Sequence, residues 1–350
     1  MGQAAIQVGQ RLIGPGAPCF VIAEAGSNHN GSLEQALRLV DLAADSKADA
    51  VKFQIFRAEK LYPRSAGPSA YLKDQRSIYA IIQQMELPYE WLPRLADHCK
   101  GAGVLFMASV FDEESLERCD PFVQVHKIAS YEMTHYPLID RVARKGKPVV
   151  ISTGAGQMKE VGEMVERFRA TGNRQLLLMQ CTAAYPAPPE ALSLRAIPLL
   201  SSAFHLPVGL SDHSRHPWLA PVAAVALGAA LVEKHFTFSN TLPGPDHKFA
   251  VEPEELKEMI RLIRLTEQAL GNGEKRVHPI EQELRDFARR SVFTSRAVGV
   301  GEILTEDCLV VLSNGQHPHG AEPGLLPSLI GRRATRDLKP EEPVGPKDFE

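Results

Sequence analysis

The amino-acid sequence predicts a (β/α)₈ TIM barrel followed by a small, mostly β domain. Eight short apolar segments alternate with amphipathic, helix-like segments up to about Gly271. Beyond Gly271 this alternation stops, and a charged stretch leads into short β-like pieces. An open, doubly wound sheet is the alternative. However, Gly154-Ala155-Gly156 is followed by Lys159 where a dinucleotide-binding turn requires a third small residue.

Each strand is expected from an apolar run bounded by turn residues, and each helix from apolar residues recurring every three or four positions. The expected strands are 19–25, 48–56, 104–109, 122–130, 147–152, 175–186, 206–210 and 230–236. The expected helices are 33–46, 88–103, 113–119, 134–146, 158–172, part of 188–204, 217–230 and 252–271. Ser32 and Gln35 suit a capping box for the first helix. A weak hairpin begins at Ile6, and a long polar stretch covers 57–83.

Three regions follow from these patterns. Residues 1–270 are expected to form the barrel, residues 271–290 a linker, and residues 291–350 the second domain. The linker is charged and has little apolar patterning. The last region contains the β-like pieces SVFTSRAV, CLVVL and PVG, joined by turn-rich segments.

Composition excludes several classes of protein. A formal net charge of −3 does not suit a nucleic-acid surface, so an anionic ligand would need local cations. The five cysteines are odd in number and lack CxxC spacing, which indicates reduced thiols of a cytoplasmic protein. No apolar run approaches the length of a membrane span, and no secretion signal is expected from the first residues.

Two histidines mark the ends of the last two expected strands. LPVGLSDHS delivers His213 and ALVEKHF delivers His235, with one helix between them. A strand–helix–strand unit makes these strands parallel neighbours, so their ends should lie roughly 5 Å apart. Two imidazoles at that separation suit a divalent metal ion with open coordination positions, and Asp212 or Asp246 could orient them. The alternative is that both histidines are structural.

The other strand ends are also polar and would face the same barrel mouth. Lys52 and Lys127 are the most informative, because a lysine buried there is costly unless an anion pairs with it. The alternative is that each lysine extends outward to solvent. Together with nearby hydroxyls and the turn from Ser152 to Gly156, whose backbone N–H groups face a helix start, the lysines predict a phosphate site.

A metal ion, a phosphate site and a carboxylate suit the condensation of a phosphorylated nucleophile with a carbonyl compound. Glu24 ends the first strand and would handle a proton or a water molecule. The alternative is that Glu24 only hydrogen-bonds the following SNHNG loop.

Eight motifs resemble the N-acetylneuraminate (sialic acid) synthase family: IAEAGSNHNGS, AVKFQIF, HKIAS, ISTGAG, QCTAAYP, GLSDHS, VEKHFT and GPDHKFAVEP. They occur in this order between Ile22 and Pro253, and the tail resembles the family's C-terminal antifreeze-like (SAF) domain. The resemblance implies a transferase that condenses phosphoenolpyruvate with an N-acetylated amino sugar, such as N-acetylmannosamine, and water. The products would be a nine-carbon 2-keto sugar acid of the N-acetylneuraminate type and phosphate.

The resemblance also implies a divalent metal cofactor, Mn²⁺ first, with Mg²⁺ or Co²⁺ as alternatives. It implies a homodimer in which each antifreeze-like domain covers the partner's active site. Matched by motif, His213 and His235 hold the metal and Glu24 is the catalytic carboxylate. The residues implied to bind phosphoenolpyruvate are Lys52, Ser109, Lys127, Ser130, Ser152, Thr182 and Ser211, and those implied near the sugar are Gln54, Glu132, Tyr185 and Asp246.

Three stretches depart from the family pattern. CTNIYP of many bacterial members is CTAAYP at 181–186, and Ser-Thr-Pro-Phe is Ala-Ser-Val-Phe at 108–111. An Arg-Pro-Gly loop of the C-terminal domain is replaced by Leu-Ser-Asn-Gly at 312–315, without arginine. These departures concern the sugar pocket, so neuraminate, legionaminate, pseudaminate and a spore-coat sugar acid all remain open.

Two other functions compete with this one. The chain could be a different barrel synthase or aldolase, which uses phosphoenolpyruvate with a sugar phosphate or cleaves a keto acid. It could also be a carbohydrate- or ice-binding protein whose enzyme fold has lost its catalytic activity. The intact polar strand ends argue against the binding protein, because an inactive site has no physical need for buried lysines.

Overall fold

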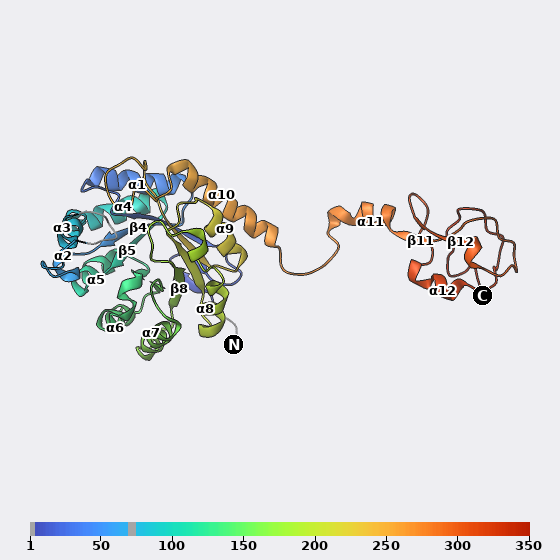
Figure 1. The fold of residues 1–350 in the computed structure, drawn as a ribbon, viewed down its shortest axis with the longest axis horizontal. Coiled ribbons are helices and arrows are strands. Elements are labelled where there is room, and N and C mark those ends of the chain that lie inside the picture. The colour runs from blue at the N-terminus through green and yellow to red at the C-terminus, as the bar shows by residue number, and fades with distance from the viewer. Residues whose placement is uncertain (1–3, 69–74) are drawn as a thin grey trace. The chain divides into compact units, whose positions relative to one another are not determined.

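The computed structural model describes residues 4–68 and 75–350 of the chain. It divides into two compact units, Met1–Gly271 and Asn272–Glu350 (Figure 1). The division falls where the apolar alternation of the sequence ends. Among the described helices, none is both long enough and apolar enough to cross a lipid bilayer.

The first unit is a closed barrel of eight parallel strands, which confirms the predicted fold class and excludes the open sheet. The strands follow chain order around the barrel, and the last pairs with the first to close it. They are β3 (Phe20–Gly26), β4 (Ala50–Ile55), β5 (Leu105–Val110), β6 (His126–Ile128), β7 (Val149–Ser152), β8 (Leu176–Cys181), β9 (Val208–Asp212) and β10 (Leu231–His235). The expected hairpin, β1 (Ile6–Val8) and β2 (Arg11–Ile13), precedes them.

Helices surround this barrel (Figure 1). Their apolar stripes pack against the outward side chains of the strands in one continuous core, in which Leu39 of the first helix and Val51 of β4 are both fully buried. The helices are α1 (Leu33–Asp45), α2 (Ala58–Leu61), α3 (Ile78–Gln84), α4 (Leu92–Ala102), α5 (Glu113–Cys119), α6 (Tyr136–Arg144), α7 (Met158–Ala170), α8 (Ala196–Phe204), α9 (Leu219–Ala226) and α10 (Pro253–Leu270).

Some local predictions differ from the structure. The strand expected at 122–130 is only three residues long, because 3₁₀ turns at Asp120–Phe122 and Ser130–Thr134 flank it. The helix expected at 88–103 begins with a 3₁₀ turn, Tyr89–Trp91, and continues as α4. The polar stretch 57–83 contains α2 and α3, and its residues 69–74 lie outside the described part of the chain.

The first helix is capped by Ser32, but not by the predicted reciprocal pair. Ser32 Oγ accepts the Gln35 backbone N–H at 3.2 Å. The Gln35 side chain donates instead to the carbonyl of Asn28 at 2.7 Å. Gln35 therefore ties the loop after β3 to α1 rather than completing a capping box.

Alternation along the strands divides the barrel unit into an outer and an inner core. The residues that face the barrel axis form a separate apolar cluster around Phe20, Ile22, Ala50, Met107, Val125, Val150, Leu177, Met179 and Leu231. Two positions further along most of these strands, the residue on the same inward face is polar. The barrel axis therefore changes from apolar to polar toward the C-terminal ends of the strands.

The second unit has a core of its own, which includes Val292, Val298, Leu304, Leu338 and Val344. β11 (Arg290–Thr294) pairs antiparallel with β12 (Leu309–Ser313), as expected from two of the β-like pieces, and the third contributes an isolated bridge between Phe293 and Pro343. Two helices belong to this unit, α11 (Gln282–Ala288) within the interval expected as a linker and α12 (Leu326–Leu329). A small antiparallel β region therefore follows the barrel.

Candidate active site

The strand-end residues that the sequence assigned to one site do lie together. A ring of buried side chains faces the barrel axis at the C-terminal ends of the strands: Glu24, Lys52, Ser109, Lys127, Ser152, Ser211, Glu233 and His235. Most of them lie two residues beyond an inward apolar residue, as Glu24 follows Ile22 and Lys52 follows Ala50. The period of two that defines the inner face therefore also aims these groups at one another.

Lys52 is the centre of a buried charge cluster. Its Nζ lies 2.7 Å from Glu24 Oε2 and 3.5 Å from Glu233 Oε1. It also donates to Ser109 Oγ at 2.8 Å, and Ser211 Oγ donates to Glu233 Oε1 at 3.2 Å. The burial of Lys52 is thus compensated by two carboxylates of the protein itself.

Lys127 has no such compensation. Its Nζ donates to the Ile128 carbonyl at 3.1 Å, and no carboxylate in the described ranges 4–68 and 75–350 forms an ion pair with it. Burial lowers the pKa of Lys127, and the more distant Glu233 opposes that shift. An anionic ligand in the barrel mouth would stabilise this cation.

Glu24 and Glu233 share Lys52 but differ in proton affinity. Burial raises the pKa of Glu24, the Lys52 ammonium opposes the shift, and the Glu233 carboxylate adds to it. Burial acts on Glu233 in the same direction, but Lys52 and Lys127 outweigh it and hold the pKa of Glu233 below its usual value. Glu24 is therefore the group that takes up a proton more readily. Such a difference in pKa between two neighbouring carboxyl groups is expected where one of them acts as an acid or base.

His213 and His235 lie side by side at the same barrel mouth, with ring centroids 5.4 Å apart. His213 Nδ1 lies 3.0 Å from the Thr182 carbonyl. Because a carbonyl only accepts hydrogen bonds, Nδ1 is the donor in this contact, and Nε2 is the nitrogen that could bind a metal ion when the ring is neutral. His235 Nδ1 is buried without a hydrogen-bond partner and lies 3.9 Å from Asp246 Oδ2. Burial lowers the pKa of His235 well below its usual value, so this ring stays neutral.

A divalent metal ion fits this arrangement with two protein ligands. The space left by Gly26 is surrounded by polar groups: a Cβ built there would lie 3.2 Å from Asp246 Oδ2, 3.4 Å from Glu24 Oε1 and 3.6 Å from His235 Cε1. Within the part of the chain that the structure describes, no group of three or more His, Cys, Asp or Glu residues forms a closed metal cage. An ion here would rely on the two imidazoles and keep open coordination positions, as catalytic metals do.

The turn after β7 offers fewer free backbone donors than the sequence predicted. The Thr153 N–H donates to the Met179 carbonyl, and the Gly154 N–H donates to Ser130 Oγ at 3.0 Å. The Glu160 carboxylate already caps the N-terminus of α7. The N–H groups of Thr153, Gly154 and Gly156 are therefore already paired within the protein. The group left for a ligand is Ser152 Oγ, which is buried and has no hydrogen-bond partner.

The residues implied near the sugar lie around the same mouth. Gln54 Nε2 donates to Glu24 Oε1 at 3.1 Å, and the Tyr185 ring packs 4.2 Å from the His213 ring. Glu132 lies in the 3₁₀ turn after β6, and its Oε2 is buried without a hydrogen-bond partner. Burial raises the pKa of Glu132 to about 7 and that of Asp246 to about 6.

Thr182 and Asp212 are turned away from the mouth. The Thr182 hydroxyl donates to the Ala191 carbonyl at 2.8 Å, so only its backbone carbonyl, through His213, acts on the site. Asp212 pairs with Lys234, its register partner on β10, and strand alternation places this pair on the outer side of the strands. Of the two aspartates suggested as outer partners of the histidines, Asp246 lies 3.9 Å from His235 Nδ1, whereas the Asp212 carboxylate contacts Lys234.

Sequence reasoning did not assign roles to Glu233 and Lys234. Glu233 lies two residues before His235, so period-two alternation was the signal that it also faces the barrel axis. Lys234 lies between them and faces outward, and nothing in the sequence pairs it with Asp212. That pairing depends on the register between β9 and β10.

Comparison with known proteins identifies the family of this chain. A model described as the NeuB family matches residues 39–275, and a SAF domain model matches residues 289–350. The chain belongs to the NeuB family. As a member it is a phosphoenolpyruvate-dependent synthase with a C-terminal SAF domain, and enzymes of this family generally use a divalent metal ion.

Several NeuB-family relatives match nearly the whole chain. Spore coat polysaccharide biosynthesis protein SpsE of Bacillus subtilis is 45% identical over 96% of this chain and 94% of its own length. N,N'-diacetyllegionaminic acid synthase of Legionella pneumophila is 36% identical over 93% of each chain. The crystal structure of N-acetylneuraminic acid synthetase from Leptospira borgpetersenii, in complex with citrate, superposes with a TM-score of 0.74 at 32% identity, covering 81% of this chain and 95% of that one.

Proposed function

We propose that this NeuB-family protein condenses phosphoenolpyruvate with an N-acetylated amino sugar, N-acetylmannosamine or a close relative, and water. A carbon–carbon bond forms between C3 of phosphoenolpyruvate and the aldehyde carbon of the open-chain sugar. Water is consumed, phosphate leaves, and the product is a nine-carbon 2-keto sugar acid. The observation that carries this proposal is Lys127, a buried cation without a carboxylate partner in the described chain, which lies in the same barrel mouth as two available imidazoles.

The phosphate and carboxylate of phosphoenolpyruvate are assigned to the inner ring. Lys127 supplies an unbalanced positive charge, and the buried Ser152 hydroxyl supplies an unpartnered hydrogen-bonding group. Lys52, Ser109, Ser130 and Ser211 complete this set, whereas Thr182 acts through its carbonyl on His213. A dianion placed here would stabilise both lysines in the low-dielectric barrel mouth.

Glu24 is assigned the proton-transfer role. Its raised pKa makes it the carboxyl group that can give or take a proton near neutral pH, while Glu233 stays ionised and holds Lys52 in place. Gln54 orients Glu24 by donating to its Oε1. The difference in pKa between Glu24 and Glu233 is therefore part of the proposed chemistry.

A divalent cation held by His213 and His235 would supply Lewis acidity toward the sugar carbonyl. Mn²⁺ is the first choice, with Mg²⁺ or Co²⁺ as alternatives. Asp246 lies near His235 and is assigned to orient that ring and to face the sugar, together with Glu132 and Tyr185.

Each of the three regions of the chain has its own proposed role. Residues 1–270 would carry the chemistry, residues 271–290 would act as linker, and residues 291–350 would cover the active site of the partner in a homodimer. Support comes from the linker, where Ile280, Leu284 and Phe287 are 86%, 62% and 48% exposed. Leu284 and Phe287 lie three residues apart on one face of α11, and Ile280 lies in the 3₁₀ turn just before it. Such a group of exposed apolar side chains fits a second copy of the chain.

The identity of the sugar has a second candidate. The 45% identity with SpsE exceeds the 36% identity with the legionaminic acid synthase and the 32% identity with the N-acetylneuraminic acid synthetase. This order favours a sugar acid of a spore-coat polysaccharide over N-acetylneuraminate itself. The departures at 181–186 and 312–315 fall in stretches assigned to the sugar side and are in keeping with a different sugar.

One experiment tests the reaction class and the sugar together. The protein is incubated with Mn²⁺, phosphoenolpyruvate and each member of a panel of N-acetylated hexosamines and their 6-phosphates, and phosphate and 2-keto acid are measured. We expect both products in equal amounts with an unphosphorylated N-acetyl sugar. Turnover only with a sugar 6-phosphate would contradict the unphosphorylated acceptor, and no turnover with any sugar would contradict the proposed reaction.

A further inference from the structure

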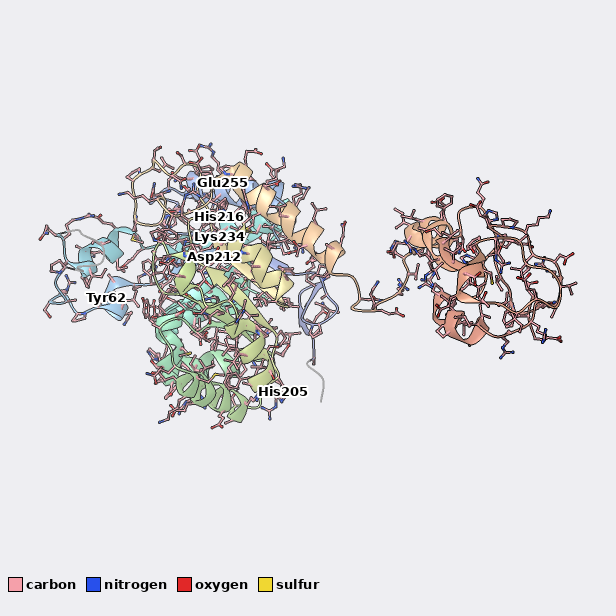
Figure 2. All side chains as sticks on the ribbon, turned by 45° about the vertical axis from the view of Figure 1, so that its right-hand side comes forward. Tyr62, His205, Asp212, His216, Lys234 and Glu255 are labelled. Atoms are coloured by element: carbon pink, nitrogen blue, oxygen red, sulfur yellow. The ribbon has the colours of Figure 1, made fainter. Side chains whose placement is uncertain are left out.

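A buried ion pair lies directly behind the two histidines. Asp212 ends β9 one residue before His213, and Lys234 precedes His235 on β10. Lys234 and Asp212 are register partners on these adjacent strands. Because side chains alternate along a strand, this pair faces the helices when the histidines face the barrel axis. Lys234 Nζ lies 2.6 Å from Asp212 Oδ2, and the two side chains are 1% and 0% exposed (Figure 2).

The hydrogen-bonding capacity of Lys234 is fully used. Its three protons go to Asp212 Oδ2, to the Ser214 carbonyl at 2.6 Å and to the His216 carbonyl at 3.1 Å. Asp212 Oδ1 accepts the Ser214 N–H at 2.8 Å, and Oδ2 accepts Ser214 Oγ at 3.1 Å. Lys234, from the strand of one histidine, thereby holds the chain on both sides of the other, His213.

A second set of contacts holds the same loop from α10. Arg215 donates to both carboxylate oxygens of Glu255 at 3.1 Å and to Asn240 Oδ1 at 3.0 Å. Glu255 in turn accepts the Glu252 N–H at the start of α10. Figure 2 shows Asp212, Lys234, His216 and Glu255 gathered in one region of the barrel unit. The segment 214–216 is therefore fixed between β10 and α10.

Stability alone does not account for a buried pair of this kind. The desolvation of two charges offsets most of their attraction, so a well-packed apolar pair would join the strands equally well. What the ions add is direction, since they hold three backbone groups of the adjacent loop in place: the Ser214 N–H and the carbonyls of Ser214 and His216. We propose that Asp212 and Lys234 are positioning residues that orient His213 and His235 toward a divalent metal ion. This inference rests on the metal site of the proposed function.

The test compares three variants with a matched control. Asp212→Asn keeps an oxygen for the Ser214 N–H but removes the charge, and Lys234→Met keeps the volume of the side-chain stem. The double variant Asp212→Asn/Lys234→Met leaves no charge unpaired and decides the question if a single variant does not fold. The control is Asp49→Asn: this carboxylate is 3% exposed, pairs with Arg264 at 3.1 Å and accepts the Val21 N–H at the opposite end of the barrel.

Two quantities are measured on the metal-free full-length protein: Mn²⁺ affinity by isothermal titration calorimetry and the visible absorption spectrum after Co²⁺ loading. We expect the Asp212 and Lys234 variants to bind Mn²⁺ about 10- to 100-fold more weakly and to show an altered Co²⁺ spectrum. Asp49→Asn should lower the melting temperature but leave both quantities unchanged, because it weakens the fold without touching the strand ends that carry the histidines.

His213→Ala is measured in parallel to separate the two proposals. If His213→Ala binds Mn²⁺ like the unchanged protein, the metal site itself is wrong and this inference fails with it. If His213→Ala loses Mn²⁺ while the folded Asp212 and Lys234 variants bind it normally and keep the Co²⁺ spectrum, the positioning role is wrong and the proposed function stands.

Discussion

Lys52 Nζ lies 2.7 Å from Glu24 Oε2, with both side chains buried in the barrel mouth. Lys127 is buried on the same inner face, but no carboxylate in the described chain pairs with it. Two lysines that look equivalent in the sequence therefore have opposite energetic roles. The charge of Lys52 is balanced by carboxylates of the protein, whereas the charge of Lys127 would be balanced only by a bound anion.

Lys127→Met should weaken phosphoenolpyruvate binding and leave folding intact. The change keeps the aliphatic stem and deletes a charge that only a ligand balances. We expect a loss of about 2–4 kcal/mol in binding free energy, roughly 30- to 1000-fold in Kd. Calorimetric titration with phosphoenolpyruvate measures the affinity, and urea unfolding measures stability. A stable variant with unchanged affinity would contradict the assignment of Lys127.

Lys52→Met should instead destabilise the folded protein. Glu24 and Glu233 would lose their shared cation, and breaking a buried ion pair from one side costs about 3–5 kcal/mol. Urea unfolding at pH 7 measures this cost. The double variant Lys52→Met/Glu24→Gln should recover part of it, because one of the two stranded carboxylates is then neutral. Equal stability of Lys52→Met and the unchanged protein would show that the cluster carries no energetic weight.

His213→Ala and His235→Ala should each abolish turnover and metal binding. The metal-free variants should melt close to the unchanged metal-free protein, because these imidazoles lie at the rim of the barrel rather than in its apolar core. The matched control is His205→Asn, an exposed histidine at the C-terminal end of α8 whose φ of 54° asparagine also tolerates (Figure 2). Full activity of either alanine variant after chelation would overturn the metal assignment.

Glu132 should make stability fall as pH rises through neutrality. Burial raises the pKa of Glu132 to about 7, so the folded protein binds this proton more tightly than the unfolded chain does. The resulting stabilisation is complete below about pH 4, the ordinary range of a glutamate, and is lost as pH rises through 7. Glu132→Gln mimics the protonated form at every pH.

Urea unfolding of both proteins between pH 5 and pH 8 measures this effect. We expect the stability of the unchanged protein, relative to Glu132→Gln, to decrease over that interval. Glu59→Gln, an exposed change on α2, serves as the control and should track the unchanged protein. Parallel curves for Glu132→Gln and the unchanged protein would rule out a buried, protonated Glu132.

Truncation near Arg289 should leave a folded barrel that binds metal and phosphoenolpyruvate but turns over sugar slowly. The reason is that the barrel mouth would remain open to water, which weakens its electrostatics. Mixing the truncated chain with full-length His235→Ala, under conditions that let subunits exchange, should restore part of the activity. In the mixed dimer an intact barrel would lie beneath an intact C-terminal domain. A truncated protein with the full-length rate would disprove the covering role.

The polar strand ends were predictable because each directly follows an apolar run in the chain. Once the eight runs were recognised as barrel strands, Glu24, Lys52, Lys127 and His235 were expected at the barrel mouth, because the C-terminal ends of the strands meet there. The short length of β6 was not predictable, because the expected strand 122–130 overlaps 3₁₀ turns at both ends, Asp120–Phe122 and Ser130–Thr134.

The sequence by itself determined the barrel class, the two histidines at neighbouring strand ends and the resemblance to the synthase family. Only the tertiary structure decided how the charges are balanced: Lys52 pairs with Glu24, Lys127 pairs with no carboxylate of the described chain, and Asp212 pairs with Lys234 behind the histidines. The reason is physical. Alternation and apolar periodicity act between neighbours in the chain, whereas an ion pair exists only where strand register brings two distant residues within about 4 Å of each other.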